Sequence, residues 1–486
     1  MMNTKYHKYL PLEVRQSRWA TDAEIQGSAT KIDLTQPYTA SGIPVFSDGK
    51  TMFTDAADSH TLIYGSSGSK KTRLFVFPTV CSLLQAGESC IITDPKGEIY
   101  DRCAGLAQQT GHKVVVLNLR DLSVSDGWNP LAEPYFLYKN PETRDLGISL
   151  LNDFIETLAN KGRNKVADPF WAATAASLSL ALLLILFESA KSVDEVNISN
   201  FMNLCYAFGN RTEERFLTHL MQEIPQDSLC AINLRSILNA ADRTRQSIQV
   251  SLFSYVNNYM INQTLQQMIS ASDFSFSELA KQPFALFLIL PDETTKYNDL
   301  VATLVSQSYQ IFIREAQLTK TKRLPIRINY VLDEFNNIPP LPDADGMLSA
   351  ARSRNIRFFL VVQGYMNQYG NDADIIRANC SNWVFLTSRD VKLLTELSEL
   401  CGNGNDGGPL ISTSQLQRLN KEKGEALLLF GRNYPYVGRF PDIDEYQFPK
   451  LEAPAFRKKV RRKFPFKTIV SIVQDNKENL HNWFTD

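Results

Sequence analysis

Residues 65–72 combine glycines and serines with a final lysine and threonine, directly after a short apolar run at 61–64. The segment reads Gly65, Ser66, Ser67, Gly68, Ser69, Lys70, Lys71 and Thr72. A phosphate-binding loop needs small residues so that its backbone N–H groups can turn inward, a lysine for the β and γ phosphates, and a hydroxyl for Mg²⁺. Gly65, Lys71 and Thr72 meet these needs. The segment therefore predicts a site for ATP and Mg²⁺, and a flexible polar turn is the alternative.

Two carboxylates, Asp333 and Glu334, end a second apolar run at 328–332. In a P-loop ATPase an aspartate at this place orients Mg²⁺ and its water, and the adjacent glutamate polarises the attacking water. Two acidic residues also start many ordinary loops, so their meaning depends on the phosphate-binding loop upstream. Together the two motifs predict that Thr72 and Asp333 hold Mg²⁺ and that Glu334 is catalytic.

Two further polar segments follow apolar runs. Gln363 comes after the run at 358–362, where its amide could contact the γ-phosphate or the attacking water; a plain Gln-Gly turn is the alternative. The segment 93–98, Thr-Asp-Pro-Lys-Gly-Glu, follows the run at 90–92. The carboxyl edge of a parallel sheet places binding loops at such points, but the same residues are common in turns. Spacing alone leaves the role of 93–98 open.

The apolar runs themselves predict the elements that position these residues. Short aliphatic or β-branched runs, several of them apolar at every position, are typical of parallel strands covered on both faces. They occupy 61–64, 90–93, 114–117, 285–290, 328–332, 358–362, 383–387 and 426–430. From about 141 to 281 the apolar residues instead follow a helical spacing. The sequence thus predicts an α/β fold with a mostly parallel sheet, interrupted by an all-helical inserted domain.

The two ends of the chain differ from this middle. The runs 43–46 and 51–53 flank a turn-forming segment, which predicts a hairpin near the N-terminus. Past 451 a basic run is interleaved with phenylalanines, and we expect it to be solvated or to contact DNA phosphates or anionic lipid. The predicted divisions are an N-terminal segment 1–55, a nucleotide-binding domain in two halves at 56–140 and 282–450, a helical domain 141–281, and a basic tail 451–486.

The composition is that of a packed globular protein. The chain has 486 residues, 44% of them hydrophobic, and a net charge of −1, so no global field would draw it to nucleic acid or a membrane. Its 7 scattered cysteines indicate reduced thiols in the cytosol. The uncharged run 169–187 is long enough to span a membrane, but its first half is small and weakly polar, so we expect a buried helix. Residues 1–10 lack the apolar core of a secretory signal.

In this order the motifs make the sequence similar to the TraG-like coupling proteins of type IV secretion and conjugation systems. The strings are IYGSSGSKKTR, IITDPKGEIYD, WNPL, DPFW, LFLILPDETT, YVLDEFNNI, ARSRNI, VVQG and IIRANCSNWVFL, spread over about residues 55–440. The resemblance implies a RecA-like P-loop ATPase domain with an inserted helical domain. It further implies a homo-hexameric ring that engages DNA, a relaxase or a relaxosome and feeds it to type IV secretion channel proteins.

The resemblance also implies roles for single residues. Lys71 and Thr72 match the Walker A lysine and hydroxyl of the family. Asp333 and Glu334 match the Walker B pair, and Gln363 matches the sensor glutamine. The catalytic set implied is therefore Glu334, Lys71 and Gln363.

The sequence departs from the family pattern in two places. Relatives usually carry glycine where this chain has Lys70, and a side chain there is expected to crowd the phosphates or to add a second cation to them. Relatives also commonly begin with transmembrane helices, which we do not expect here, so any membrane contact would need a partner or the basic tail. Ring ATPases often complete a site with a neighbouring subunit's arginine. Arg352, Arg354 and Arg357 are candidates, and a solvated basic face is the alternative.

We therefore expect a cytoplasmic ATPase, located at most peripherally at the inner face of the cell membrane. ATP hydrolysis would deliver DNA, or a DNA-linked relaxase, to a type IV secretion channel during conjugative transfer. Two alternatives stay open. A related motor of the FtsK and HerA type would pump DNA without a secretion partner, and a non-hydrolysing docking protein would have lost its phosphate-binding loop through Lys70.

Overall fold

The computed structural model describes residues 17–38, 40–160, 169–210, 212–260, 262–370, 372–461 and 463–484. The first ten residues, for which we expect no secretory signal, lie outside these ranges. The main sheet is built from β4 (His60–Tyr64), β5 (Ser89–Asp94), β6 (Lys113–Asn118), β7 (Phe284–Ile289), β8 (Ile328–Leu332), β9 (Ile356–Val362), β10 (Cys380–Phe385), β11 (Glu425–Phe430) and β12 (Tyr436–Arg439). Every strand predicted from the apolar runs is present within a few residues, whereas β12, with its alternating burial, was not predicted.

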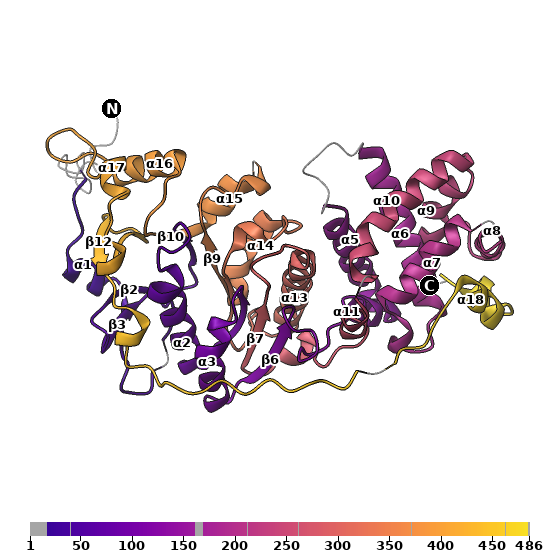
Figure 1. The fold of residues 1–486 in the computed structure, drawn as a ribbon, viewed down its shortest axis with the longest axis horizontal. Coiled ribbons are helices and arrows are strands. Elements are labelled where there is room, and N and C mark those ends of the chain that lie inside the picture. The colour runs from indigo at the N-terminus through magenta and orange to yellow at the C-terminus, as the bar shows by residue number, and fades with distance from the viewer. Residues whose placement is uncertain are drawn as a thin grey trace.

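The order of the strands in the sheet is β12-β11-β10-β4-β9-β8-β5-β7-β6 (Figure 1). The strands from β10 to β6 are all parallel, and β11 and β12 extend the sheet antiparallel at one edge. The prediction of a mostly parallel α/β sheet is confirmed. Strands β4 and β8 are separated only by β9, a strand that comes much later in the chain than β4. This order brings the ends of three distant segments together.

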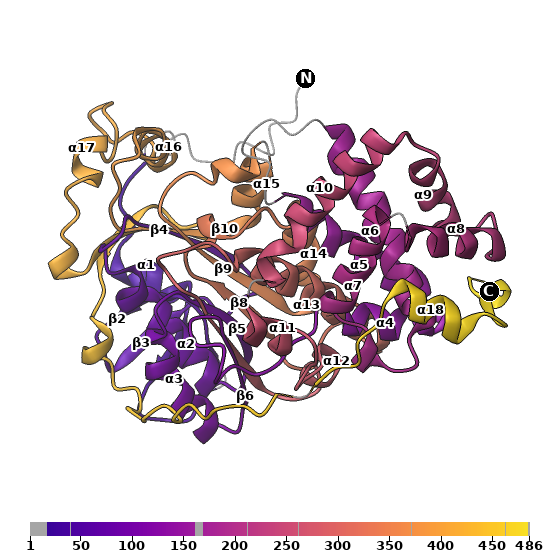
Figure 2. The same ribbon diagram turned by 45° about the vertical axis from the view of Figure 1, so that its right-hand side comes forward.

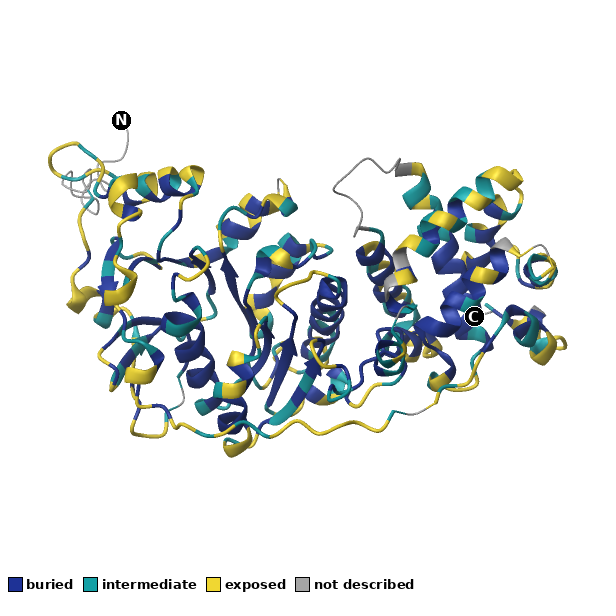
Figure 3. Ribbon diagram, in the orientation of Figure 1, coloured by how far each residue is buried: buried dark blue, intermediate teal, exposed yellow. Residues whose placement is uncertain are grey.

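Both faces of the sheet are buried. Successive side chains of a strand point to opposite faces, and helices cover each face. On one face, residues such as Ile63, Ile92 and Val331 pack against α2 (Phe77–Gln85) and α3 (Glu98–Gln109). On the other, residues such as Tyr64 and Tyr330 pack against α13 (Asn298–Leu318) and α14 (Ala344–Ala351). Figure 2 shows the sheet between these two layers, and Figure 3 shows its central strands almost entirely buried. The burial explains why the strands read as continuous apolar runs.

Between β6 and β7 the described chain is helical. It forms α4 (Ala132–Lys139), α5 (Arg144–Asn160), α6 (Pro169–Ser189), α7 (Ile198–Gly209), α8 (Glu214–Glu223), α9 (Leu229–Leu238), α10 (Asp242–Met260), α11 (Gln263–Met268) and α12 (Phe276–Leu279). Figure 1 shows these helices as a bundle beside the sheet. This is the helical insertion that the sequence predicts; its boundaries at 141 and 281 stay a prediction.

Helix α6 is the core of that bundle. By length and composition its residues Phe170–Ser189 could cross a membrane, since their mean hydropathy is 2.1. The helix is instead packed among α5, α7, α9 and α10, and its second half is buried. Its packing agrees with the expected buried helix.

The N-terminal segment forms a small sheet of its own. The predicted hairpin is present as β2 (Pro44–Ser47) and β3 (Thr51–Thr54), which pair antiparallel. A third strand, β1 (Thr30–Asp33), was not predicted; it pairs with the other side of β3. Only one of its four residues, Ile32, is buried, so it gives no clear apolar run.

The basic tail is an extended strap rather than a free end. It crosses beneath the ribbon from the sheet to the helical bundle (Figure 1) and ends in α18 (Ile469–Asn476), which contacts α7 and α8. Phe456 stacks on Tyr100 with ring centroids 4.7 Å apart, and Lys459 pairs with Asp126. Lys467 is buried, and its ammonium lies 3.3 Å from the Glu195 carboxylate. Several of the positive charges that we considered for DNA or lipid are thus used within the chain.

Replacing Lys467 with alanine is expected to loosen the strap. The change leaves Glu195 buried without its counter-charge, at a cost of about 2 kcal/mol to docking of the tail. We expect faster trypsin cleavage within 451–468 than in wild type. The matched control is Lys463→Ala, which also removes one trypsin site but alters an exposed side chain. Equal cleavage rates in the two variants would contradict the role of Lys467.

Candidate functional site

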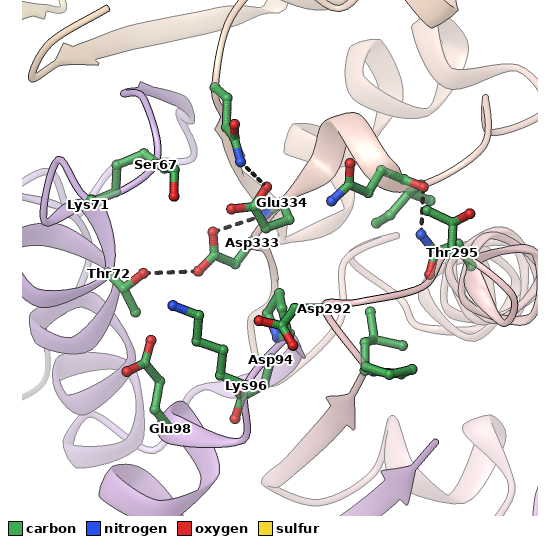
Figure 4. Close-up of a pocket in the computed structure, with 18 of the residues that line it drawn as sticks. Ser67, Lys71, Thr72, Asp94, Lys96, Glu98, Asp292, Thr295, Asp333 and Glu334 are labelled. Carbon is green, nitrogen blue, oxygen red and sulfur yellow. Dashed lines mark hydrogen bonds between the residues drawn. The ribbon is translucent and has the colours of Figure 1, made fainter. Parts of the chain in front are cut away.

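A cavity of about 500 Å³ lies at the carboxyl edge of the sheet. The loops that follow β4, β5, β7, β8 and β9 all line it, because parallel strands end at the same edge. Figure 4 shows side chains from these loops converging on one space. The phosphate-loop residues, the paired carboxylates and the glutamine predicted from sequence therefore meet in one place.

The loop 65–72 leaves β4 and turns tightly. A side chain at Gly65 would place its Cβ 2.4 Å from the Ser69 hydroxyl and 2.9 Å from the Lys71 chain, so only glycine fits. Gly68 adopts a positive φ of 74°, which glycine accepts without strain. The Ser66 N–H donates to the carbonyl of Thr387 beyond β10 and anchors the loop to the sheet. The Ser69 hydroxyl is buried and has no hydrogen-bond partner among the described residues.

The helix after this loop starts with a wide turn. Residues Thr72–Val76 form a π-helical turn, in which the Phe77 N–H donates to the Thr72 carbonyl, and α2 follows directly. Pro78 has no backbone N–H, so a regular helix could not form a hydrogen bond from this residue in any case. A wider turn just before it therefore loses one hydrogen bond fewer than elsewhere in a helix. Such π-turns are frequent at functional sites, and this one sets the direction of Thr72.

Lys71 is nearly buried, with 6% of its surface exposed. Its ammonium donates to the carbonyl oxygens of Gly65 at 2.6 Å and Ser66 at 3.4 Å. Burial lowers the pKa of Lys71, while the charges of Asp333 and Glu334 oppose the shift. The lysine is thus held over its own loop, on the side where the carboxylates lie.

Asp333 links the first loop to the end of β8. The Thr72 hydroxyl donates to one of its carboxylate oxygens at 3.1 Å, and the Glu334 N–H donates to the other at 2.9 Å (Figure 4). Burial raises the pKa of Asp333 to about 6, although Lys71 lowers it. A buried carboxylate beside a hydroxyl is a donor pair that suits a divalent cation. Among the described residues no group of three or more His, Cys, Asp or Glu could hold a metal by itself.

Glu334 and Gln363 contact each other. The Gln363 side-chain amide donates to the Glu334 carboxylate at 2.6 Å. Glu334 has a φ of 55°, the left-handed region that a non-glycine residue rarely adopts. Strained backbone of this kind is found at functional sites, where surrounding structure holds it. The two residues meet because β9 lies next to β8 in the sheet.

The segment 93–98 lines the cavity with several polar side chains. Asp94 accepts the N–H groups of Gly97 at 2.9 Å and Tyr100 at 2.7 Å, and burial raises its pKa to about 6. Lys96 and Glu98 line the cavity. Asp292, from the loop after β7, lines it as well and pairs with Arg120 at 2.6 Å. None of these residues has a role that the motifs predict, and the signal that marks both segments is their place directly after buried strands.

The Lys70 side chain lines the cavity, and its effect on bound phosphates stays a prediction. Its backbone has a φ of 68°, the conformation for which glycine is preferred at this position. Its ammonium pairs with Glu422 at 2.7 Å, and both side chains line a separate shallow cavity with Asp48 and Arg439. The positive charge of Lys70 is therefore paired with the Glu422 carboxylate.

The three candidate arginines lie at the opposite edge of the sheet, where β9 begins. Arg357 is 1% exposed, donates to Asn329 at 2.8 Å and pairs with Glu88 at 2.7 Å, so its role is structural and it is excluded as a residue for a neighbouring subunit. Burial lowers the pKa of Arg357 to about 10. Arg352 is exposed and Arg354 half-buried. A contact of either with a neighbouring subunit stays a prediction.

Comparison with known proteins decides the family. The profile described as "Type IV secretory system Conjugative DNA transfer" matches residues 18–415. The chain belongs to this family. Two proteins from Escherichia coli named "Conjugal transfer protein TraG" are similar to it, one 25% identical over 374 residues and one 24% identical over 433 residues. These matches cover 73% and 82% of the chain, but only 56% and 66% of the two relatives.

Solved structures show the same fold. The plasmid coupling protein TrwB in complex with the ATP analogue ADPNP matches with a TM-score of 0.60 and 16% identity, over 92% of this chain and 97% of that one. TrwB in complex with ADP and Mg²⁺ matches with a TM-score of 0.57 and 15% identity, again over 92% and 97%. The RecA-like P-loop fold and the resemblance to coupling proteins are thus confirmed for this family member.

The raised pKa of Asp333 predicts that its charge opposes folding of the ligand-free protein. Its folded-state pKa of about 6 lies above the 3.8 of a free aspartate, so the penalty is full above pH 6 and disappears as the pH falls below 4. Asp333→Asn is expected to stabilise the protein by about 2 kcal/mol at pH 8 and by less at pH 5. Thermal unfolding at both pH values measures this. Exposed Asp227→Asn is the control, and a gain independent of pH would refute the explanation.

The left-handed backbone at position 70 predicts a difference in stability between two small substitutions. Lys70→Gly and Lys70→Ala both lose the ion pair with Glu422, but only alanine keeps the strain. We expect the glycine variant to be more stable than the alanine variant by about 1 kcal/mol in urea unfolding. Glu422→Gln isolates the loss of the ion pair, which is worth little at the surface. Equal stability of the two Lys70 variants would disprove the strain.

Proposed function

We propose that this chain is an Mg²⁺-dependent ATPase that powers conjugative DNA transfer. The observation that carries the proposal is the convergence of Lys71, Thr72, Asp333, Glu334 and Gln363 at one cavity, from loops that follow three adjacent strands. Family membership supports it, as does the fold shared with a coupling protein whose structures hold ADPNP or ADP with Mg²⁺. Because the chain spans 56% and 66% of its curated relatives, its activity and partners are inferred and not established.

The residues have distinct roles in this proposal. The loop Gly65, Ser66, Ser67, Gly68, Ser69, Lys70, Lys71 and Thr72 surrounds the phosphates with backbone N–H groups, and the Ser69 hydroxyl is an unused donor there. Lys71 leaves its loop carbonyls for the β and γ phosphates. Thr72 and Asp333 would hold Mg²⁺ through their hydroxyl and carboxylate oxygens. Bound Mg²⁺ supplies positive charge to the β and γ phosphates.

Glu334 is the proposed base for the attacking water. Its carboxylate accepts a hydrogen bond from the Gln363 amide, so this oxygen is engaged until that contact opens. A γ-phosphate competing for the Gln363 amide would free Glu334 to accept a proton. The hydrogen bond between Gln363 and Glu334 would thus break when ATP binds, and its loss would free the base for hydrolysis.

Hydrolysis in a homo-hexamer would move the cargo. We propose that the helical domain 141–281 recognises DNA or a relaxase, and that α13 carries nucleotide-dependent changes to it, because α13 starts at the cavity and packs against α5. The cargo then passes to type IV secretion channel proteins. We place the protein in the cytoplasm at the inner face of the cell envelope, where such a channel opens.

The ion pair of Lys70 argues against one of the two alternatives and leaves the other open. The docking hypothesis rests on damage to the loop by Lys70, but the Lys70 ammonium is bound by Glu422 outside the phosphate loop. The FtsK and HerA type of motor shares the site chemistry, so only the cargo distinguishes it. Loss of conjugative transfer without a defect in chromosome segregation would favour the coupling role.

ATP hydrolysis by the purified protein, with and without single- and double-stranded DNA, tests the proposal. Lys71→Ala is expected to weaken nucleotide binding, whereas Glu334→Gln should retain binding and lose at least about 100-fold in turnover, because only the base is removed. Malachite-green phosphate release and nucleotide titration separate the two effects. Turnover equal to wild type in Glu334→Gln would refute the assigned base, and no turnover in wild type with DNA would favour the docking role.

A further inference from the structure

One cationic side chain of the cavity has neither an ion pair nor a hydrogen bond among the described residues. Four cationic side chains line it: Lys70, Lys71, Arg73 and Lys96. Lys70 pairs with Glu422, Arg73 pairs with Asp442 and Asp444, and Lys71 donates to two carbonyls of its loop. Lys96 has no ion pair or hydrogen bond to any residue in the described part of the chain.

The backbone around Lys96 is well ordered by local bonds. The buried Asp94 carboxylate accepts from Gly97 and Tyr100 on either side of the turn, and Gly97 has a positive φ of 81°. Pro95 fixes one further dihedral. The turn is therefore rigid, and the exposed Lys96 side chain is presented from its tip.

The direction of the side chain is visible in Figure 4, where the Lys96 ammonium lies near Thr72, Asp333 and Glu98. Burial lowers the pKa of Lys71, with opposing effects of Asp333 and Glu334, and the positive charge of Lys96 adds to the lowering. The two ammonium groups are thus close enough to repel each other across the cavity. Two ammonium groups that line one cavity, neither of them ion-paired to a described residue, are complementary to a phosphate group.

We propose that Lys96 is a second phosphate-contacting lysine, which binds the γ-phosphate of ATP from the side opposite the loop 65–72. The inference depends on the nucleotide site proposed above and names a further residue of it. Thr72 and Asp333 are the residues that would hold the metal of a bound nucleotide. Lys96 approaches these residues from the loop after β5, whereas the N–H groups of 65–72 enclose the β-phosphate from the loop after β4.

The proposal distinguishes ATP from ADP. A charge-assisted hydrogen bond to the γ-phosphate is worth about 1.5–3 kcal/mol, which corresponds to about 10-fold to 100-fold in affinity. Lys96→Ala should therefore weaken ADPNP by about 10-fold or more and ADP by less than about threefold. Lys96→Arg should recover much of the ADPNP affinity, because it restores the positive charge.

Competition titration against a fluorescent nucleotide, with Mg²⁺ present, measures both affinities on the full chain. Lys281→Ala is the matched control, since Lys281 is an exposed lysine just before β7, at the opposite edge of the sheet. A melting temperature equal to wild type shows that Lys96→Ala is folded. Equal weakening of ADPNP and ADP, or no weakening of either, overturns the proposal for Lys96.

The same titration separates this inference from the function on which it rests. If wild type binds ADPNP, Lys71→Ala does not, and Lys96→Ala binds like wild type, then the role of Lys96 is wrong and the nucleotide site stands. If wild type binds neither nucleotide, the nucleotide site itself is refuted, and the role of Lys96 with it.

Discussion

The structure depends on one constraint: parallel strands end at the same edge of their sheet. β4 lies far from β8 and β9 in the chain, yet the carboxyl ends of the three strands are neighbours because β9 pairs with both β4 and β8. Main-chain hydrogen bonds between buried strands hold this register, and slipping it by one residue would turn each apolar side chain to the wrong face. The relative positions of Lys71, Asp333 and Gln363 are therefore a property of the sheet, not of the loops.

Burial sets the electrostatics of the site. Asp94 and Asp333 are carboxylates at the ends of buried strands, and desolvation raises the pKa of each to about 6. Lys71 is shifted in the opposite direction for the same reason. Groups that are destabilised as ions in the empty cavity gain most from a ligand of opposite charge. A cation at Asp333 and an anion at Lys71 both fit this pattern, which is the charge distribution of a metal-bound nucleotide.

The rest of the molecule connects this site to the helical bundle by two routes. One is α13, which begins beside the cavity and is buried along most of its length against the sheet and α5. The other is the strap, which is tied to α3 by Tyr100 and to α7 by a hydrogen bond from the Lys467 N–H to the Asn200 side-chain oxygen. Both routes are continuous contacts, so a change at the carboxyl edge of the sheet has a physical path to the bundle.

The sequence by itself determined the fold class and the parallel strands, and it predicted loop 65–72 as a phosphate-binding loop. Buried strands are apolar at every position, and a phosphate loop demands particular residue types at fixed spacing, so both signals are local. Only the tertiary structure decided which polar segments share a cavity, because strand order is set by long-range pairing. It showed that Lys70 pairs with Glu422, that Arg357 is buried against Glu88, and that the basic tail is a strap. Each of these outcomes depends on a partner between 269 and 352 residues away, and no local pattern records such a distance.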